Sequence, residues 1–173
     1  SLASLFGADL TDRTRTAQAA PGAPLPLELD GVRVFVAGRP VGLFFVSPSQ
    51  INFWLPPDTP FGTAAVEVRN TRTGALAAGT VAIASVAPGL FAVDCLRADA
   101  GAILNGIAFE REPFAAETPA NPGPDKRTRL SIFGTGIRQA RAVEASLLDD
   151  SGRTLGLAVE YAGPAPGFVG LDQ

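Results

Sequence analysis

Few side chains of this chain could carry out chemistry, because it contains no histidine among its 173 residues. That absence removes the Ser-His-Asp and Cys-His relays and the usual zinc ligand. Glu110, Glu112 and Glu117 are close in sequence and could be imagined as the acid/base pair of a glycoside hydrolase. Such a pair needs a defined separation across a cleft, which nothing in this stretch sets. We interpret these carboxylates as solvated groups of a connector and predict that the protein is not an enzyme.

Two further groups have both a chemical and a structural interpretation. Residues 149–152 (Asp-Asp-Ser-Gly) offer oxygen atoms to calcium but lack further oxygen ligands at regular spacing, so a hairpin turn is the favoured interpretation. Cys95 is the single cysteine, which excludes an internal disulfide and a site of several thiolates. We interpret Cys95 as a small buried hydrophobe, with an intermolecular bridge or a lipid-linked thiol as the sharper alternative. We expect neither a metal nor a cofactor.

The remaining candidates are aromatic and apolar residues that could bind a partner. Phe53 and Trp54 are adjacent on an expected strand, so their side chains point to opposite faces. One of them is therefore core, and the other faces solvent, a neighbouring module or a partner. Exposed Trp and Tyr side chains can stack on sugars or anchor a protein. The candidate partner-binding residues are Phe53, Trp54, Tyr161, Phe168 and Val169.

Composition indicates a globular β-rich chain. Hydrophobic residues make up 46% and charged residues 18%, which is enough apolar material for packed cores. The 19 Gly and 15 Pro predict many turns between short strands and disfavour helix. A formal charge of -3 leaves no basic face for a polyanion, which argues against nucleic-acid binding. No apolar run approaches the ~20 residues that span a bilayer, so we expect no membrane span.

Apolar alternation between turn signals predicts the strands. The pattern at 32–36, the turn at 37–40 and the pattern at 41–45 predict a hairpin with one buried face. Further strands are predicted at 51–55, which Pro56-Pro57 ends, at 63–69 and at 78–86, and a second hairpin at 143–148 and 155–161 around residues 149–152. Two short runs, 87–91 and 101–105, could pair with each other, and the proline-rich stretch 110–129 is expected to be an ordered connecting loop.

An incomplete internal repeat organises the chain. Residues 4–10 (SLFGADL) match 131–137 (SIFGTGI), residues 44–48 (FFVSP) match 160–164 (EYAGP), and Gln173 aligns with Gln50. The first copy continues through about three more strand-like segments that the second copy does not contain. We therefore expect two related β-modules, the second without its last strands. An unfinished sheet leaves backbone groups unpaired and apolar faces open, and both must be covered.

Six motifs carry a family resemblance over nearly the whole chain. They are SLFG, VSPSQINF (46–53), APGLF (87–91), GAILN (101–105), LSIFGTG (130–136) and YAGPAPGFVG (161–170). In this order they resemble an uncharacterised C-terminal domain of secreted acidobacterial proteins, the Solibacter type. The resemblance implies an all-β fold of two tandem immunoglobulin-like (IPT/TIG-type) β-sandwich modules. The expected boundaries are 1–87 for the first module, 88–129 for the connecting segment with a short hairpin, and 130–173 for the incomplete second module. Family members usually continue after the Gln with three more strands.

These observations favour a noncatalytic, extracytoplasmic structural module, secreted, on the cell surface or periplasmic. It would pack against or connect other proteins, with a protein partner or a second copy adding a strand to an open sheet edge, as in a filament or larger complex. A nearly equal interpretation of the open edge is that its closing strands follow Gln173. The functional alternative is a carbohydrate-binding or hydrolase accessory domain that uses exposed aromatics, with weak carbohydrate contact. An export or sorting role is compatible with the first interpretation.

Overall fold

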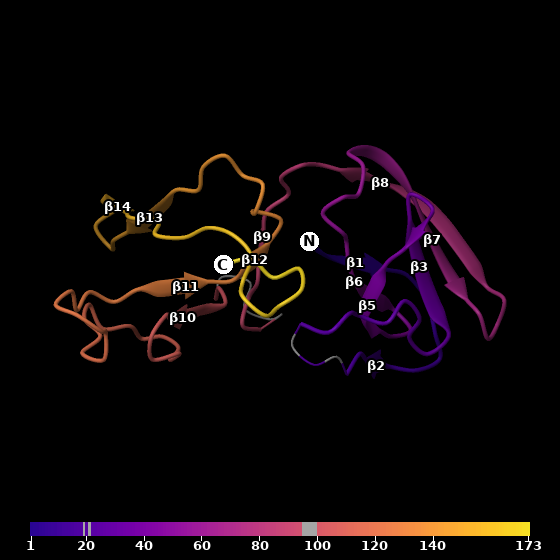
Figure 1. The fold of residues 1–173 in the computed structure, drawn as a ribbon, viewed down its shortest axis with the longest axis horizontal. Helices are drawn as coiled ribbons and strands as arrows, with labels where there is room; N and C mark the ends of the chain where they lie inside the picture. Colours follow the sequence, from indigo (N-terminus) through magenta and orange to yellow (C-terminus); the bar gives the residue numbers. More distant parts are fainter. Residues whose placement is uncertain (19, 21, 95–99) are drawn as a thin grey trace. The chain divides into compact units, whose positions relative to one another are not determined.

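The computed structural model describes residues 1–18, 20, 22–94 and 100–173 (Figure 1). Within these residues all regular secondary structure is β-strand, which confirms the predicted all-β class. The described part of the chain has no helix long and apolar enough to cross a membrane. The chain forms two compact units: unit 1 consists of Ser1–Val86 and Ala165–Leu171, and unit 2 consists of Ala87–Pro164 and Asp172–Gln173.

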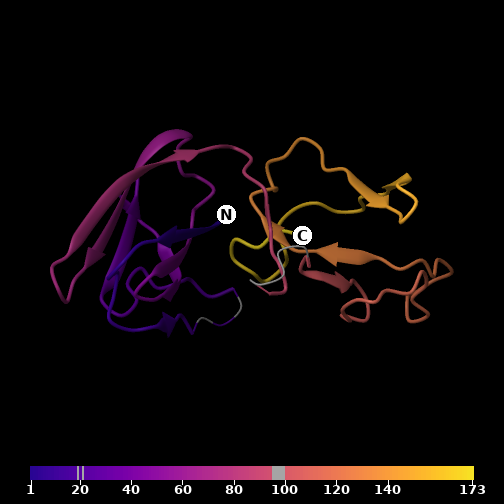
Figure 2. The ribbon, with the colours of Figure 1, turned by 180° about the vertical axis from the view of Figure 1, so that it is seen from behind.

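Unit 1 contains two four-stranded antiparallel sheets (Figures 1 and 2). The first has the order β1-β6-β5-β2, with the bounds Leu2–Phe6, Gln50–Trp54, Gly42–Val46 and Arg15–Thr16. The second has the order β4-β3-β7-β8, with the bounds Arg39–Pro40, Val32–Val36, Gly62–Asn70 and Leu76–Ile83. The predicted strand at 78–86 thus begins and ends earlier, because Leu76 already pairs with Arg69 across the turn.

One hydrophobic core joins the two sheets of unit 1. Alternate residues of β3 and β7 contribute Val32, Val34, Val66 and Val68, as their period-two pattern predicts. Strands β5 and β6 contribute further buried residues from the other sheet, with Leu43 and Ile51 fully buried. A cluster that draws on both sheets is the arrangement of a β-sandwich. The remaining members are Leu10, Val36, Val41, Val46, Phe53 and Ala64.

The chain changes sheets at Gly42. Strand β3 turns back through β4, and the Val41 amide still donates to the Val34 carbonyl oxygen at 3.0 Å. Strand β5 then pairs with β6 in the other sheet, so the predicted hairpin at 32–45 has the right turn but splits after it. A Cβ at Gly42 would lie 2.6 Å from the Cβ of Leu25, closer than two carbons can approach. Glycine therefore allows this crossing.

Unit 2 contains three two-stranded antiparallel sheets. The pairs are β9 with β12 (Gly89–Leu90 and Gly134–Thr135), β10 with β11 (Ile103–Asn105 and Leu130–Ile132), and β13 with β14 (Ala145–Leu148 and Thr154–Leu157). The runs 87–91 and 101–105, predicted to pair with each other, meet only at one end, where the Ala102 amide donates to the Phe91 carbonyl at 2.6 Å beside a bridge between Ala92 and Gly101. Their ladders form instead with the 130–135 stretch. The interpretation of Cys95 falls on a residue outside the described ones.

The described buried positions of unit 2 are small or polar. Asn105 is the centre of one hydrogen-bond network. Its side-chain Nδ2 donates to the Thr118 hydroxyl at 2.7 Å, and its Oδ1 accepts hydrogen bonds from the Ile107 and Ala108 amides. Thr118 in turn lies 2.8 Å from the Thr128 hydroxyl. Among the described residues, the buried ones of this unit are Ala100, Asn105, Thr118, Asn121, Gly134, Gly136, Gly163 and Asp172. The described part of unit 2 thus buries no large apolar side chain.

Backbone hydrogen bonds recur at matching positions of the internal repeat. The Gly7 amide donates to the Ser49 carbonyl at 3.1 Å, and the matching Gly134 amide donates to the Asp172 carbonyl at 2.9 Å. The Ser47 amide donates to Gln50 at 2.8 Å, and the matching Gly163 amide donates to Gln173 at 2.9 Å. The second copy differs by carrying residues 165–171 before its Gln, and these belong to unit 1. The sequence repeat therefore corresponds to a repeated backbone arrangement.

Candidate interaction surfaces

The first candidate surface is the free edge of β8 in unit 1. This strand pairs with β7 along its whole length, from Leu76 to Ile83, and no described strand lies on its other side. Every residue of β8 is exposed except the half-buried Ile83. The strand contains no charged residue and no proline, and these are the usual means of protecting an edge from another chain. The β8 edge is therefore chemically open to a further strand.

The second candidate surface is the hairpin of β13 and β14 in unit 2. Direct cross-strand pairing places Ala145 opposite Leu157 and Leu147 opposite Leu155, so these four residues share one face. We call this the hairpin apolar face. Leu147, Leu155 and Leu157 have exposed fractions of 51%, 40% and 48%, so no described part of the chain covers them fully. A two-stranded hairpin with such a face is marginally stable without a third strand or a covering element.

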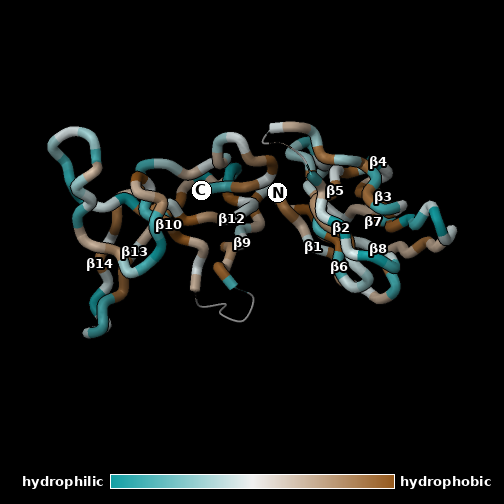
Figure 3. Tube along the Cα trace, turned by 90° about the horizontal axis from the view of Figure 1, so that it is seen from below, coloured by the Kyte–Doolittle hydropathy of each residue, from teal (hydrophilic) through white to brown (hydrophobic). Residues whose placement is uncertain are grey.

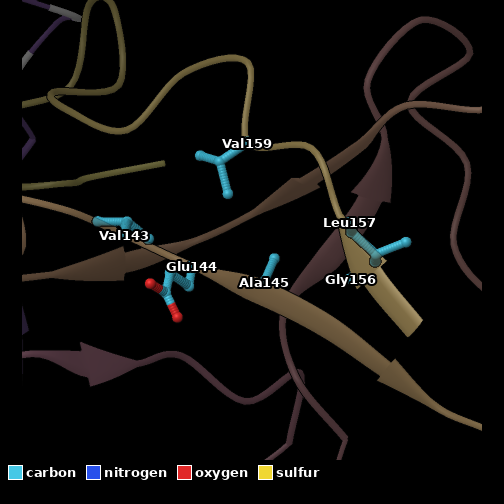
Figure 4. A pocket seen from close by; sticks show the side chains of 6 residues that line it. All are labelled: Val143, Glu144, Ala145, Gly156, Leu157 and Val159. Carbon is cyan, nitrogen blue, oxygen red and sulfur yellow. The ribbon is translucent and has the colours of Figure 1, made fainter. Parts of the chain in front are cut away.

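A shallow pocket of about 370 Å³ lies beside the hairpin apolar face (Figure 4). Its lining comes from the irregular segment that leads into β13, from the start of β13, and from the end of β14 and the residues after it, with Glu144 as the single charged residue (Figure 4). Val143, Leu157 and Val159 contribute aliphatic side chains to the lining, and much of the rest of its surface is polar. Figure 3 shows hydrophobic residues along these strands. The aliphatic part of such a lining accommodates an apolar side chain, and Glu144 is its one charged group.

The turn of this hairpin is held by Asp149. Its Oδ1 accepts hydrogen bonds from the Ser151 hydroxyl at 2.6 Å and from the Ser151 and Arg153 amides at 3.0 and 2.9 Å. Hydrogen bonds from the Ser151 hydroxyl and the Arg153 amide lower the pKa of Asp149. Gly152 adopts a φ of 81°, which confirms the predicted turn chemistry. Among the described residues no group of three metal-ligating side chains occurs here or elsewhere.

The predicted aromatic candidates occupy different environments. Phe53 is buried in the core of unit 1, so it does not form part of an exposed surface. Trp54 points the other way and is half-buried, and a Cβ at Gly170 would lie 3.0 Å from its ring. The Trp54 indole nitrogen is buried and has no hydrogen-bond partner among the residues that the structure describes. Phe53 therefore lies in the core and Trp54 lies on the opposite face of β6, against Gly170, as the strand alternation predicts.

Tyr161, Phe168 and Val169 do not form one site with these two residues. Tyr161 belongs to unit 2, is 54% exposed and donates its hydroxyl to the Pro164 carbonyl at 2.7 Å. Phe168 and Val169 belong to unit 1, with Phe168 62% exposed and Val169 half-buried. The five predicted residues are therefore split between two units.

The carboxylates of the connector are solvated side chains. Glu110, Glu112 and Glu117 are all exposed. The strongest electrostatic cluster of this segment is instead at Asp125, which accepts hydrogen bonds from Arg127 at 2.8 Å and Arg129 at 3.0 Å. The Arg127 hydrogen bonds above all hold the pKa of Asp125 well below its usual range. A carboxylate that stays ionised in ion pairs is poorly suited to donate a proton.

The open β8 edge and the hairpin apolar face were missed as sites by sequence reasoning. A signal was present for β8, because no charged residue occurs between Arg72 and Asp94. An uncharged stretch of that length contains no residue that would protect an edge strand. The hairpin apolar face gave no separate signal, because the same alternation is expected of a strand that packs on a core.

Comparisons of the chain with protein-family models, with curated proteins and with solved structures found no match. The surfaces described above therefore carry the functional argument alone.

Proposed function

We propose that this protein is a noncatalytic, extracytoplasmic structural module that binds other proteins, with unit 2 receiving an extended segment at the hairpin apolar face. The observation that carries the proposal is the contrast within unit 2. Its described buried positions are small or polar, while Leu147, Leu155 and Leu157 are 40–51% exposed. Because these side chains are already about half covered, completing their burial contributes only part of the roughly 1.5–3 kcal/mol that full burial of a leucine gives, and this still favours an occupied face.

An extended segment is the occupant that matches both features of the hairpin. Strands β13 and β14 pair only with each other among the described residues, which leaves an outer edge on each. A strand added to either edge would use its backbone groups for affinity and its alternate side chains for specificity. One apolar side chain of such a strand would fit the pocket beside Leu157. These features support strand addition over the binding of a small polar molecule.

The immunoglobulin-like architecture of the two units is part of the same proposal. We infer that both units descend from immunoglobulin-like sandwiches of the Solibacter-type family. The recurring amide bonds of Gly7 and Gly134, at 3.1 and 2.9 Å, support a shared ancestry of the two copies. The carbohydrate alternative gains little from Trp54, because this residue is half-buried and sugar stacking needs an open ring face.

Selection from a random peptide library displayed on phage tests the proposal. The expected result is a consensus with apolar residues at alternate positions, because such a strand buries one face on the hairpin. The variant Leu147→Asp with Leu155→Asp should lose this consensus, whereas Leu148→Asp on the opposite face should retain it. A native chain that selects no alternating consensus, or one that the double variant still selects, would contradict the proposal.

A further inference from the structure

We propose that two copies of this chain pair through β8 in antiparallel orientation, with the two-fold axis at Gly79, so that their β4-β3-β7-β8 sheets join into one. This surface lies on unit 1 and is independent of the hairpin apolar face. The proposal rests on the directions of the β8 backbone groups, on the single register that pairs all of them, and on the residue at the axis.

Hydrogen bonds on both sides of β7 fix the directions of the β8 backbone groups. The Ala37 amide donates to the Ala65 carbonyl at 2.9 Å, so odd-numbered residues of β7 bond toward β3. The Asn70 amide donates to the Ala75 carbonyl at 2.9 Å, so even-numbered residues of β7 bond toward β8. Bonding directions alternate along an antiparallel ladder. In β8 the odd-numbered residues therefore bond to β7, and the even-numbered residues face the open edge.

The open edge thus presents four amides and four carbonyls. They belong to Leu76, Ala78, Thr80 and Ala82. In an antiparallel pair, each bonded position must face a bonded position of the other strand. Pairing Leu76 with Ala82 of the second copy, and Ala78 with Thr80 of the second copy, uses all eight groups of each strand. A shift of the register in either direction leaves outward groups at one end of β8 unpaired.

This register places Gly79 opposite Gly79 of the second copy. The two residues form a non-hydrogen-bonded pair, where Cα atoms approach to about 4.5 Å and side chains are closest. Nothing lies within 4 Å of a Cβ built on Gly79, so the position is open on its own unit. A two-fold contact also places every charge near its own equivalent, and β8 has none. A second copy is therefore an occupant that the edge accepts without unpaired backbone or repelled charge.

Charge swapping at Gly79 tests both the pairing and its axis, with sedimentation velocity of the 173-residue chain from micromolar to millimolar concentration as the measurement. The native chain should form a species of twice the 17.8 kDa monomer mass. Gly79→Lys and Gly79→Glu should each raise the dimer dissociation constant about fivefold, because like charges lie directly opposite each other. An equimolar mixture of the two variants should restore dimer formation.

A control variant separates edge pairing from general charge effects. Ala65→Lys places the same charge on β7, one strand away from the edge, and should dimerise like the native chain. Circular dichroism of each variant should match the native spectrum, because Gly79 and Ala65 are exposed. A native chain that remains monomeric, a dimer insensitive to Gly79→Lys, or a mixture that dimerises no better than either variant alone would each overturn the proposal. None of these outcomes affects peptide selection by unit 2.

Discussion

Asp172 is the side chain whose surroundings most constrain unit 2. It is fully buried and accepts hydrogen bonds from the Ile137 amide at 3.0 Å and from Nε of Arg138 at 2.8 Å. Its backbone also exchanges hydrogen bonds with Gly134 in both directions. A buried carboxylate paired in this way fixes the loop after β12 against the end of the described chain. Together with the Asn105 network, this residue supplies buried polar contacts in a unit whose described part buries no large apolar side chain.

The first prediction concerns this ion pair. Asp172→Ala should lower the free energy of unfolding of unit 2 by about 3–5 kcal/mol, because it leaves the Arg138 charge largely buried without this carboxylate. Asp172→Asn keeps an acceptor for the Ile137 amide and should cost less. Amide exchange of Gly134 and Ile137 in urea provides the measurement. Equal protection in all three proteins would show that the pair does not hold this loop.

A second prediction at this scale concerns Gly42. Gly42→Ala should destabilise unit 1 by about 1–3 kcal/mol, because the added methyl group overlaps the Cβ of Leu25 and the backbone must move. Fluorescence of Trp54, the single tryptophan, follows unfolding in urea. Gly79→Ala is the matched control, since nothing lies within 4 Å of its added carbon. A loss of stability as large in the control would mean that Leu25 is not the cause.

Among the elements, the hairpin of β13 and β14 depends on its turn more than on packing. Its strands have four residues each, and its apolar face is half uncovered. The Asp149 carboxylate therefore supplies much of the local order through its bonds to Ser151 and Arg153. The turn of this hairpin is therefore ordered, while the outer edges of β13 and β14 can still pair with a further strand.

The third prediction is a pH dependence of this hairpin. The pKa of Asp149 is lower in the folded turn than in the unfolded chain, first because of the Ser151 hydroxyl bond. Its contribution is therefore present above the usual Asp pKa of about 3.9 and is lost as the pH falls through the lower folded value. Cross-strand NOEs between Leu147 and Leu155 should weaken over that range. The same weakening in Asp149→Asn, which does not titrate there, would assign the effect to another group.

Sequence patterns predicted the elements whose signal is local. The valines of β3 and β7 alternate because both strands cover one core, and Pro56 ends β6 because it cannot continue the ladder. The two-residue strands β9 and β12 carry too few residues to show a period. The crossing at Gly42 depends on the distant Leu25, which no local pattern reveals. Long-range neighbours therefore account for most of the differences.

The candidate surfaces were harder to predict than the strands for a related reason. An apolar residue such as Leu147 gives the same pattern whether its face is covered or open. Trp54 and Tyr161 were predicted as binding residues because of their residue types. In the structure Trp54 is half-buried, and the Tyr161 hydroxyl donates to the Pro164 carbonyl. Whether a side chain is free to bind a partner depends on whether distant segments of the chain cover it, and only the folded structure shows this.

On the scale of the whole molecule, the two units differ in how they are stabilised. Twelve buried apolar residues form the core of unit 1. The described buried positions of unit 2 are small or polar and rely on hydrogen bonds such as those of Asn105 and Asp172. Because apolar burial supplies most folding free energy, unit 1 should be the more stable body.

The fourth prediction follows from this contrast. Amides of β3, β6 and β7 should exchange with the slow rates of global unfolding, whereas those of β10, β13 and β14 should exchange through local opening. Hydrogen exchange followed by mass spectrometry of peptides from each unit measures both. A consensus peptide from the library selection should slow exchange in β13 and β14 specifically. Uniform protection across both units would contradict the contrast.

The discontinuous make-up of unit 1 has a practical consequence for dissecting the protein. Residues 165–171 belong to the same compact body as β1 and β6, with Gly170 against Trp54. A fragment that stops at Val86 would therefore expose the indole ring that this late segment covers. A recombinant fragment truncated there would lack part of unit 1 and would be prone to aggregate through the newly exposed apolar surface.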